Sequence, residues 1–184
     1  MDKKIEFLYQ SIGDIQNTIR AIDVKIGFLF VIAFMPITLI KDISESTLLL
    51  WKQYDICKLL ISTVFISWIF SILYLFLTLT SISNPTSGIH GSKPQGLFYG
   101  DGVFKIEYSF IGSIVKAKSN YTVKEIYDML PDDSQITNEL IYEKMKLTYI
   151  REMKFCRYSI CTRFIYIWLS LSIGLYFYSL IINH

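Results

Sequence analysis

The chain has 184 residues, of which 52% are hydrophobic and only 18% are charged, and its formal net charge is +2. This composition is unlike that of a soluble domain, and the near-neutral balance argues against a protein that coats nucleic acid. The three cysteines predict neither a disulfide framework nor a metal site, so we expect them to pack as small apolar residues. We therefore predict a mostly α membrane protein.

Residues 1–25 are predicted to form a cytoplasmic heptad helix that continues into the first apolar segment. Its isoleucines and leucines alternate at spacings of three and four, at Ile5, Leu8, Ile12, Ile15, Ile19, Ile22, Ile26 and Leu29. This spacing is the seam of a coiled coil, and its isoleucine content favours trimers or tetramers over dimers. The alternative is that the seam packs on another helix of the same chain, and both arrangements could hold together.

Three uncharged segments, 26–40, 59–82 and 164–182, are predicted to be transmembrane helices. The second and third contain 24 and 19 residues, which suits a hydrocarbon core of about 30 Å. The first contains 15 residues and includes Pro36, so a buried or re-entrant segment is the alternative for it. The residues between the first two spans, 41–58, are predicted to form a short external loop.

The distribution of lysine and arginine predicts the orientation of these spans. Residues 1–25 and 83–163 together hold fifteen of these basic residues, whereas 41–58 holds three. Cytoplasmic segments carry the excess of positive charge in membrane proteins. We therefore expect the N-terminus in the cytoplasm and the C-terminus outside.

Residues 83–134 are predicted to form a cytoplasmic insert with short strands. Glycine and proline punctuate its beginning, as is typical of a loop. GLFYGDG at 96–102 and FKIEYSF at 104–110 then resemble short strands. The Asp101-Gly102 dipeptide between them is typical of a hairpin turn.

Two helix starts follow. Thr122 and Glu125 have the spacing of a capping box, so a short helix is predicted over 121–130. Asp132 then opens a helix that runs through a cytoplasmic segment, 135–163, into the last span. The predicted fold has three transmembrane helices, long N-terminal and C-terminal helices extending into the cytoplasm, and a small α+β cytoplasmic insert.

No motif in the sequence predicts catalysis. The two histidines, His90 and His184, are far apart, and the chain has no zinc-protease, serine-hydrolase, P-loop or dinucleotide-binding pattern. The two stronger spans contain no charged residue, which argues against an ion-coupled transporter. We expect a protein that is not an enzyme and that binds no metal.

Several segments, in order along nearly the whole chain, resemble the transmembrane effectors of Pycsar anti-phage defence. These segments are AIDVKIGF at 21–28, GLFYGD at 96–101, NELIY at 138–142 and REMKFCR at 151–157. The chain departs from that family where Ile-Gly follows Lys25, since such effectors often have Ala-Ser there, and in a less dense basic run before the last span. The oligonucleotide-regulated effectors of the Hailong system are similar in outline.

The resemblance implies an effector in the bacterial inner membrane that is controlled by a nucleotide from a partner cyclase or nucleotidyltransferase. In the Pycsar case a cyclic pyrimidine mononucleotide activates the effector, and in the Hailong case an oligodeoxynucleotide would hold a channel shut. The expected function is that of an oligomeric channel or membrane-disrupting protein, which permeabilises the membrane and stops cell growth. The alternative is a non-catalytic membrane scaffold or accessory subunit of a larger complex.

Aromatic residues that can stack on a base, and polar residues that can meet a nucleotide, are candidates for nucleotide binding. They are Lys93, Phe98, Tyr99, Asp101, Lys105, Arg151, Lys154 and Arg157. The alternatives are strand core for the aromatics and anchoring at lipid headgroups for the last basic residues. An apolar gate is predicted at Phe28, Phe30 and Phe34.

Overall fold

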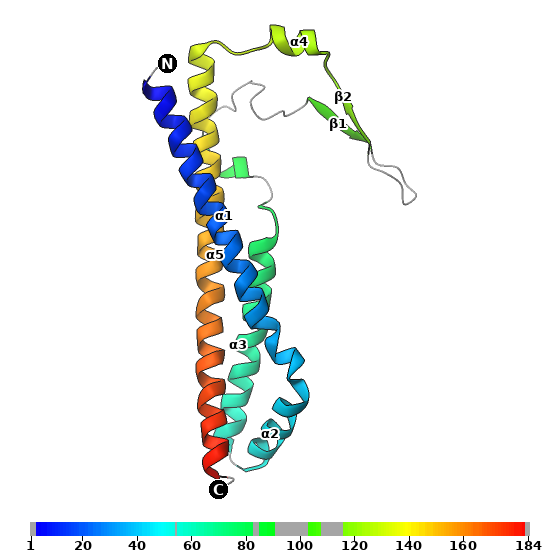
Figure 1. Cartoon of the computed structure of the whole chain (residues 1–184), viewed down its shortest axis with the longest axis vertical. Helices are drawn as coiled ribbons and strands as arrows, with labels where there is room; N and C mark the ends of the chain where they lie inside the picture. Colours follow the sequence, from blue (N-terminus) through cyan, green and yellow to red (C-terminus); the bar gives the residue numbers. More distant parts are fainter. Residues whose placement is uncertain (1–2, 54, 83–84, 91–102, 108–115, 183–184) are drawn as a thin grey trace. The chain divides into compact units, whose positions relative to one another are not determined.

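The computed structural model of the chain describes residues 3–53, 55–82, 85–90, 103–107 and 116–182 (Figure 1). Its elements are α1 Lys3–Thr38, α2 Ile40–Gln53, α3 Asp55–Leu79, the 3-10 turn η1 Pro85–Gly88, β1 Phe104–Glu107, β2 Lys116–Ser119, α4 Val123–Asp128 and α5 Asp133–Ile182. Among the described residues, three helices are long and apolar enough to cross a membrane. The predicted architecture of three long apolar helices and a small sheet is thus confirmed.

The chain divides into two compact units. Unit 1 comprises Met1–Ile15 and Thr86–Thr148, and unit 2 comprises Gln16–Pro85 and Tyr149–His184. Helices α1 and α5 each contribute to both units, because each runs without interruption across a unit boundary. The predicted continuity of the heptad helix with the first apolar segment, and of the last helix with the third, is therefore observed.

The N-terminal part of the heptad seam is buried inside unit 1. Ile5, Leu8 and Ile12 of α1 pack with the fully buried Leu140 of α5. Farther along α1, Ile22 and Ile26 lie in the core of unit 2. These seam residues therefore pack on other helices of the same chain, which was the alternative to self-association given above.

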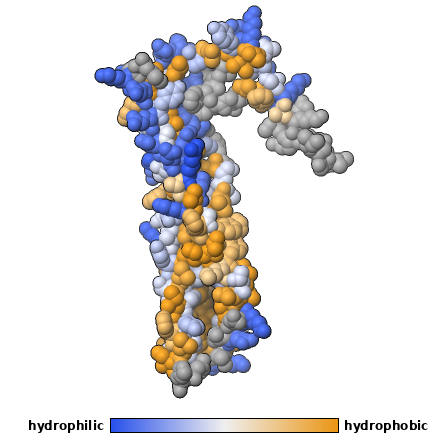
Figure 2. Space-filling model, in the orientation of Figure 1, coloured by the Kyte–Doolittle hydropathy of each residue, from blue (hydrophilic) through white to orange (hydrophobic). Residues whose placement is uncertain are grey.

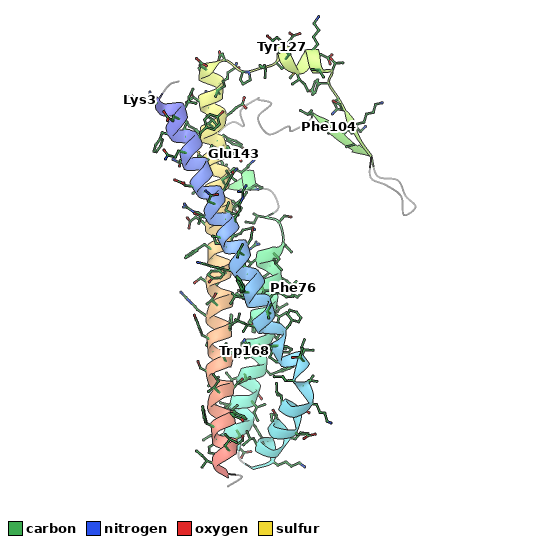
Figure 3. The ribbon with its side chains drawn as sticks, in the orientation of Figure 1. Lys3, Phe76, Phe104, Tyr127, Glu143 and Trp168 are labelled. Carbon is green, nitrogen blue, oxygen red and sulfur yellow. The ribbon has the colours of Figure 1, made fainter. Side chains whose placement is uncertain are left out.

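The rest of unit 1 contains a small antiparallel sheet. Strand β1 pairs with β2, and Phe104 lies opposite Ser119 (Figure 3). The predicted strand at 104–110 is therefore present up to Glu107, and its partner is β2. The other predicted strand, 96–102, lies outside the described residues.

Both predicted helix starts are confirmed. In α4, the backbone N–H of Glu125 donates to Thr122 Oγ1 at 3.3 Å, and Thr122 N–H donates to Glu125 Oε2 at 2.7 Å. At the start of α5, Gln135 N–H donates to Asp132 Oδ1 at 2.8 Å, and Asp132 N–H donates to Gln135 Oε1 at 3.2 Å. Each pair satisfies backbone donors that a helix start leaves without an intrahelical partner.

Unit 2 is a bundle of α1, α3 and α5. Its buried core takes Ile26 and Ala33 from α1, Leu75 from α3, and Ile165 and Trp168 from α5. Hydrophobic residues also cover much of the visible outer face of these helices (Figure 2). The bundle therefore has an apolar inside and a largely apolar outside, as expected where lipid replaces water.

The prediction of a loop over 41–58 is wrong for most of that segment, which forms α2 and the start of α3. Apolar residues recur along α2 at helical spacing, at Ile40, Ile43, Leu48 and Trp51, and all four are exposed. Another, Leu50, is buried. The apolar spacing of this segment favours an amphipathic helix.

Candidate functional site

The basic run of α5 is engaged in structural contacts within unit 2. Lys154 forms an ion pair with Asp23 of α1, and the Lys154 side chain is only 14% exposed. Arg157 donates from Nη1 to the carbonyl oxygen of Leu77 at 2.6 Å, in the last turn of α3. Carbonyls in the last turn of a helix lack an intrahelical donor, so Arg157 caps α3.

Arg151, the first of these three candidates, pairs with its neighbour on the same helix. Its Nη2 lies 2.5 Å from Oε1 of Glu152. The contacts of Lys154 and Arg157 thus join α5 to α1 and to the end of α3, whereas Arg151 makes a local pair. Two of the basic residues predicted to meet a nucleotide, Lys154 and Arg157, therefore hold three helices together.

The other candidates for nucleotide binding are separate from these three. Lys93, Phe98, Tyr99 and Asp101 lie outside the described residues. Lys105 is exposed on β1 and lies directly opposite Lys118 of β2. Two like charges placed opposite each other destabilise a strand pair, and an anion between them would relieve the repulsion.

The three phenylalanines predicted as a gate fall into two environments. Phe30 and Phe34 stack on each other with ring centroids 4.6 Å apart. The ring of Phe76 on α3 meets both of them edge-on, at 5.6 Å and 6.4 Å (Figure 3). Phe28, by contrast, is 68% exposed. Phe30 and Phe34 therefore join α1 to α3, and of the three only Phe28 faces outward.

A hydrogen bond fixes the level at which α3 meets α1. Trp68 donates from Nε1 to the carbonyl oxygen of Ala33 at 2.8 Å. Ala33 lies eight residues from each of Lys25 and Lys41, the nearest charged residues on either side. Trp68 lies ten residues after Lys58 and eleven before the end of α3. The uncharged stretches of α1 and α3 thus have their middles at one level, which we call the mid-level of unit 2.

Arg163 of α5 lies close to this mid-level. Its neighbour Cys161 donates from Sγ to the carbonyl oxygen of Ser71 at 3.3 Å. Its other neighbour, Phe164, stacks on Phe70 with centroids 5.4 Å apart. Ser71 and Phe70 are within three residues of the mid-level, which is about 5 Å along the helix. A cation on α5 therefore lies level with the middle of the uncharged stretches of α1 and α3.

The side chain of Arg163 is exposed, and within the part of the chain that the structure describes it has no hydrogen bond or ion pair. Lys154, nine residues earlier on α5, is paired across the bundle. The uncharged stretch of α5 begins only after Arg163, so it is out of register with those of α1 and α3. Sequence reasoning placed Arg163 at the edge of the last span and missed this position.

Several residues that share a face of α5 with Arg163 are small or carry a hydroxyl group, although Ile167, four residues after Arg163, is apolar and 44% exposed. Helical spacings of three and four connect Ser159, Arg163, Tyr166, Ser170 and Gly174. We call these five residues the Arg163 stripe. All of them except the half-buried Ser159 are exposed, and a Cβ built on Gly174 would meet nothing within 4 Å. The stripe is therefore a line of polar or small residues along α5, with an exposed isoleucine beside it.

The cysteines divide between the inside and the surface of unit 2. Cys57 and Cys161 are buried and Cys156 is exposed, and all three are free thiols. The prediction that they pack as small residues therefore describes two of the three.

A comparison with known proteins found no matching protein family, curated protein or solved structure.

Proposed function

We propose that this chain is a multi-pass membrane protein that assembles with copies of itself and permeabilises the bilayer in response to a nucleotide, as an effector of bacterial anti-phage defence. The observation that carries the permeabilising activity is the exposed, unpaired Arg163 at the mid-level of three long apolar helices, among the described residues. The defence role and the nucleotide signal rest on the ordered resemblance of the four segments.

The register of the uncharged stretches favours one placement of the bilayer on unit 2. A hydrocarbon core of about 30 Å centred on the mid-level takes in the uncharged stretches of both α1 and α3. The Asp23–Lys154 pair then lies at one edge, and Lys41 and Lys58 lie near the other. In this placement Arg163 is near the middle of the core.

A placement that follows the uncharged stretch of α5, 164–182, is less favourable. It brings Lys41, Asp55 and Lys58 into the hydrocarbon. It also leaves the C-terminal half of α3 in water, including Leu73, which is 50% exposed. Each charge placed at the centre of a membrane helix costs about 3 kcal/mol by insertion measurements, so the placement with one central charge is preferred.

A single central charge still needs a polar environment, and a second copy of the chain can provide one. Intramembrane ionisable residues usually face the interior of a bundle or a water-filled cavity. In unit 2 the core around Ile165 and Trp168 is mostly apolar and Arg163 is on the outside, so other copies and the water between them are the polar surroundings that we propose for it. A monomeric scaffold would leave Arg163 in lipid, which makes this alternative less favourable.

Self-assembly would therefore use a face other than the heptad seam. The described seam residues are covered inside the chain, whereas Phe28 of α1 and Tyr166 of α5 are 68% and 66% exposed. The trimer or tetramer that the seam predicted remains a proposal about subunit number. The cytoplasmic N-terminus and the external C-terminus remain proposals from the distribution of basic residues.

For the nucleotide, Lys105 and Lys118 on the hairpin are the described residues best placed to meet a phosphate. Both are exposed, and they face each other across the strand pair. Lys154 and Arg157 could take part only by giving up their contacts with Asp23 and with the end of α3. A phosphate bound there would therefore loosen the bundle, which is one route from ligand to membrane.

The test is to express the chain in bacterial cells, alone and together with a cyclase that makes cyclic CMP or cyclic UMP, and to follow membrane potential and dye uptake. Leakage that depends on the nucleotide supports the proposal. Unchanged potential and dye exclusion in all conditions, with the protein present in the membrane fraction, would favour the scaffold. A random-sequence oligodeoxynucleotide added to the reconstituted protein tests whether a nucleotide ligand instead holds the channel shut.

The hairpin offers a matched pair of variants for the same assay. Lys105→Ala combined with Lys118→Ala is expected to lower nucleotide binding several-fold, because two of the cations that face the ligand are lost. Lys124→Ala removes an exposed lysine from α4 and should leave binding unchanged. Equal binding by the hairpin variant and the wild-type protein would remove the hairpin from the site.

A further inference from the structure

The Arg163 stripe places one cation and three hydroxyl groups along α5, close to the mid-level of unit 2. Its guanidinium carries a full positive charge at any physiological pH. Ser159 and Ser170 lie one turn before and two turns after it, and Tyr166 lies one turn after it on the same face. Hydroxyl groups can hydrogen-bond to water or to an anion, and the arginine adds a fixed charge.

We propose that the Arg163 stripe of each copy lines a water-filled path through the membrane and selects small inorganic anions such as chloride. The inference rests on the proposed function, because it needs an assembly in which the stripes face one another across water. A ring of arginines at the centre of such a path lowers the energy of an anion there and raises that of a cation. The ring also supplies Arg163 with the polar surroundings that a lone chain lacks.

The dimensions of the stripe suit a path through the hydrocarbon. From Ser159 to Gly174 the stripe covers 15 residues, or about 22 Å along α5. Arg163 lies in the half of the stripe nearer the Lys154 and Arg157 contacts. Between Arg163 and Gly174, the residues of the stripe are uncharged, so an anion would meet one charged ring within it.

The apolar character of the exposed residues on α1 and α3 supports α5 as the helix that lines the path. On α1 the outward residues at the same depth are apolar, among them Phe28 and Val31, which is 72% exposed. On α3, Phe65 and Ile66 are 57% and 53% exposed. Residues of this kind suit a surface in contact with lipid, whereas the stripe does not.

The first test uses the purified full-length protein in planar bilayers or liposomes under a potassium chloride gradient, with cyclic CMP and cyclic UMP added separately. The wild-type reversal potential should show a several-fold preference for chloride over potassium. Arg163→Gln should abolish that preference while current remains, and Arg163→Lys should keep it. Lys25→Gln removes one positive charge from the same unit and serves as the control, with selectivity near that of the wild type.

The outcomes separate this inference from the proposed function. Absence of current from the wild-type protein under every condition contradicts the permeabilising function. Current whose selectivity is the same in the wild type and in Arg163→Gln contradicts the inference and leaves the function standing. That second result would mean that the guanidinium reaches the headgroups along the bundle surface instead of lining the path.

A second measurement covers the case in which Arg163→Gln does not assemble. Ser170→Cys, in a background in which Cys156 is replaced by Ser, places a thiol on the stripe two turns from Arg163. A negatively charged, water-soluble thiol reagent should modify it several-fold faster than a positively charged one of similar size. Failure of both reagents to react would show that the stripe faces lipid and would overturn the inference.

Discussion

The ammonium group of Lys154 on α5 pairs with the carboxylate of Asp23 on α1, although 131 residues separate them in the sequence. The pair lies in unit 2, where the Lys154 side chain is largely buried and that of Asp23 is 45% exposed. Both residues belong to segments that resemble the effector family. Their contact gives those segments a structural role, because it sets the register of the two helices that carry them.

Breaking this pair should weaken the bundle modestly. Lys154→Ala or Asp23→Ala should each lower the stability of the detergent-purified protein by about 1 kcal/mol, since an ion pair open to solvent on one side is worth no more. The exchange Asp23→Lys with Lys154→Asp should recover part of the loss. Thermal unfolding followed by circular dichroism is the measurement, and equal melting temperatures for all variants would argue that the pair does not form.

Lys154→Ala also separates the two roles considered for this residue. If Lys154 contacts the nucleotide directly, nucleotide affinity should fall in Lys154→Ala and rise in Asp23→Ala, because the second variant frees Lys154 from a competing contact. If the pair is purely structural, both variants should bind as the wild-type protein does. Calorimetric titration with cyclic CMP or cyclic UMP distinguishes the two.

Substitutions at Phe30 and Phe28 test whether these residues pack in the core of unit 2 or form a gate. Phe30→Ala should destabilise unit 2 by about 2 kcal/mol, because it removes a ring packed against two others and leaves a partial cavity. Phe28→Ala should change stability by less than about 0.5 kcal/mol, because the ring is exposed. Melting temperatures and basal liposome leakage are measured together. Raised leakage in Phe30→Ala with an unchanged melting temperature would restore the gate interpretation.

The hydrogen bond between Trp68 and Ala33 can be removed with little change of shape. Trp68→Phe should cost about 1 kcal/mol, through loss of the indole donor and some contact area. Trp51→Phe on α2 changes an exposed tryptophan in the same way and should have a smaller effect. Thermal unfolding of both variants in the same detergent gives the comparison, and a larger loss in Trp51→Phe would contradict the assigned contact.

The starts of α4 and α5 should respond to acid. The backbone N–H of Thr122, followed by its hydroxyl, holds the pKa of Glu125 below its usual range. The backbone N–H of Gln135, followed by the Ser134 hydroxyl, lowers the pKa of Asp132. A lowered pKa in the folded state means that the carboxylates stabilise these helix starts above the unfolded pKa values and lose that effect as pH falls through the folded ones.

Carboxyl resonances from NMR on the purified protein give these two pKa values directly, and both should titrate below the values of free side chains. Thr122→Ala removes the hydroxyl and keeps the backbone N–H, so it should move the pKa of Glu125 only part of the way back toward its usual value and leave that of Asp132 unchanged. Glu125 is exposed, so the effect is confined to the first turn of α4. Coincident titration of Glu125 in the wild type and in Thr122→Ala would exclude a contribution of the Thr122 hydroxyl.

Local signals in the sequence predicted most elements correctly. The uninterrupted spacing from Ile5 to Leu29 and the capping residues Thr122 and Asp132 specify helices through interactions between near neighbours, and all three helices are present. The segment 41–58 was predicted to be a loop from its place between two spans, whereas most of it is helical and has apolar spacing that begins at Ile40. That spacing was available in the sequence.

The alignment of one helix with another could not be predicted in this way. Helical spacing indicates which residues share a face, but it carries no information about how far one helix slides along its neighbour. That offset depends on contacts between distant segments, such as Trp68 with Ala33 and Cys161 with Ser71. From composition alone Arg163 marks the edge of a span. Packing against α3, through contacts such as Cys161 with Ser71 and Phe164 with Phe70, brings it level with the middle.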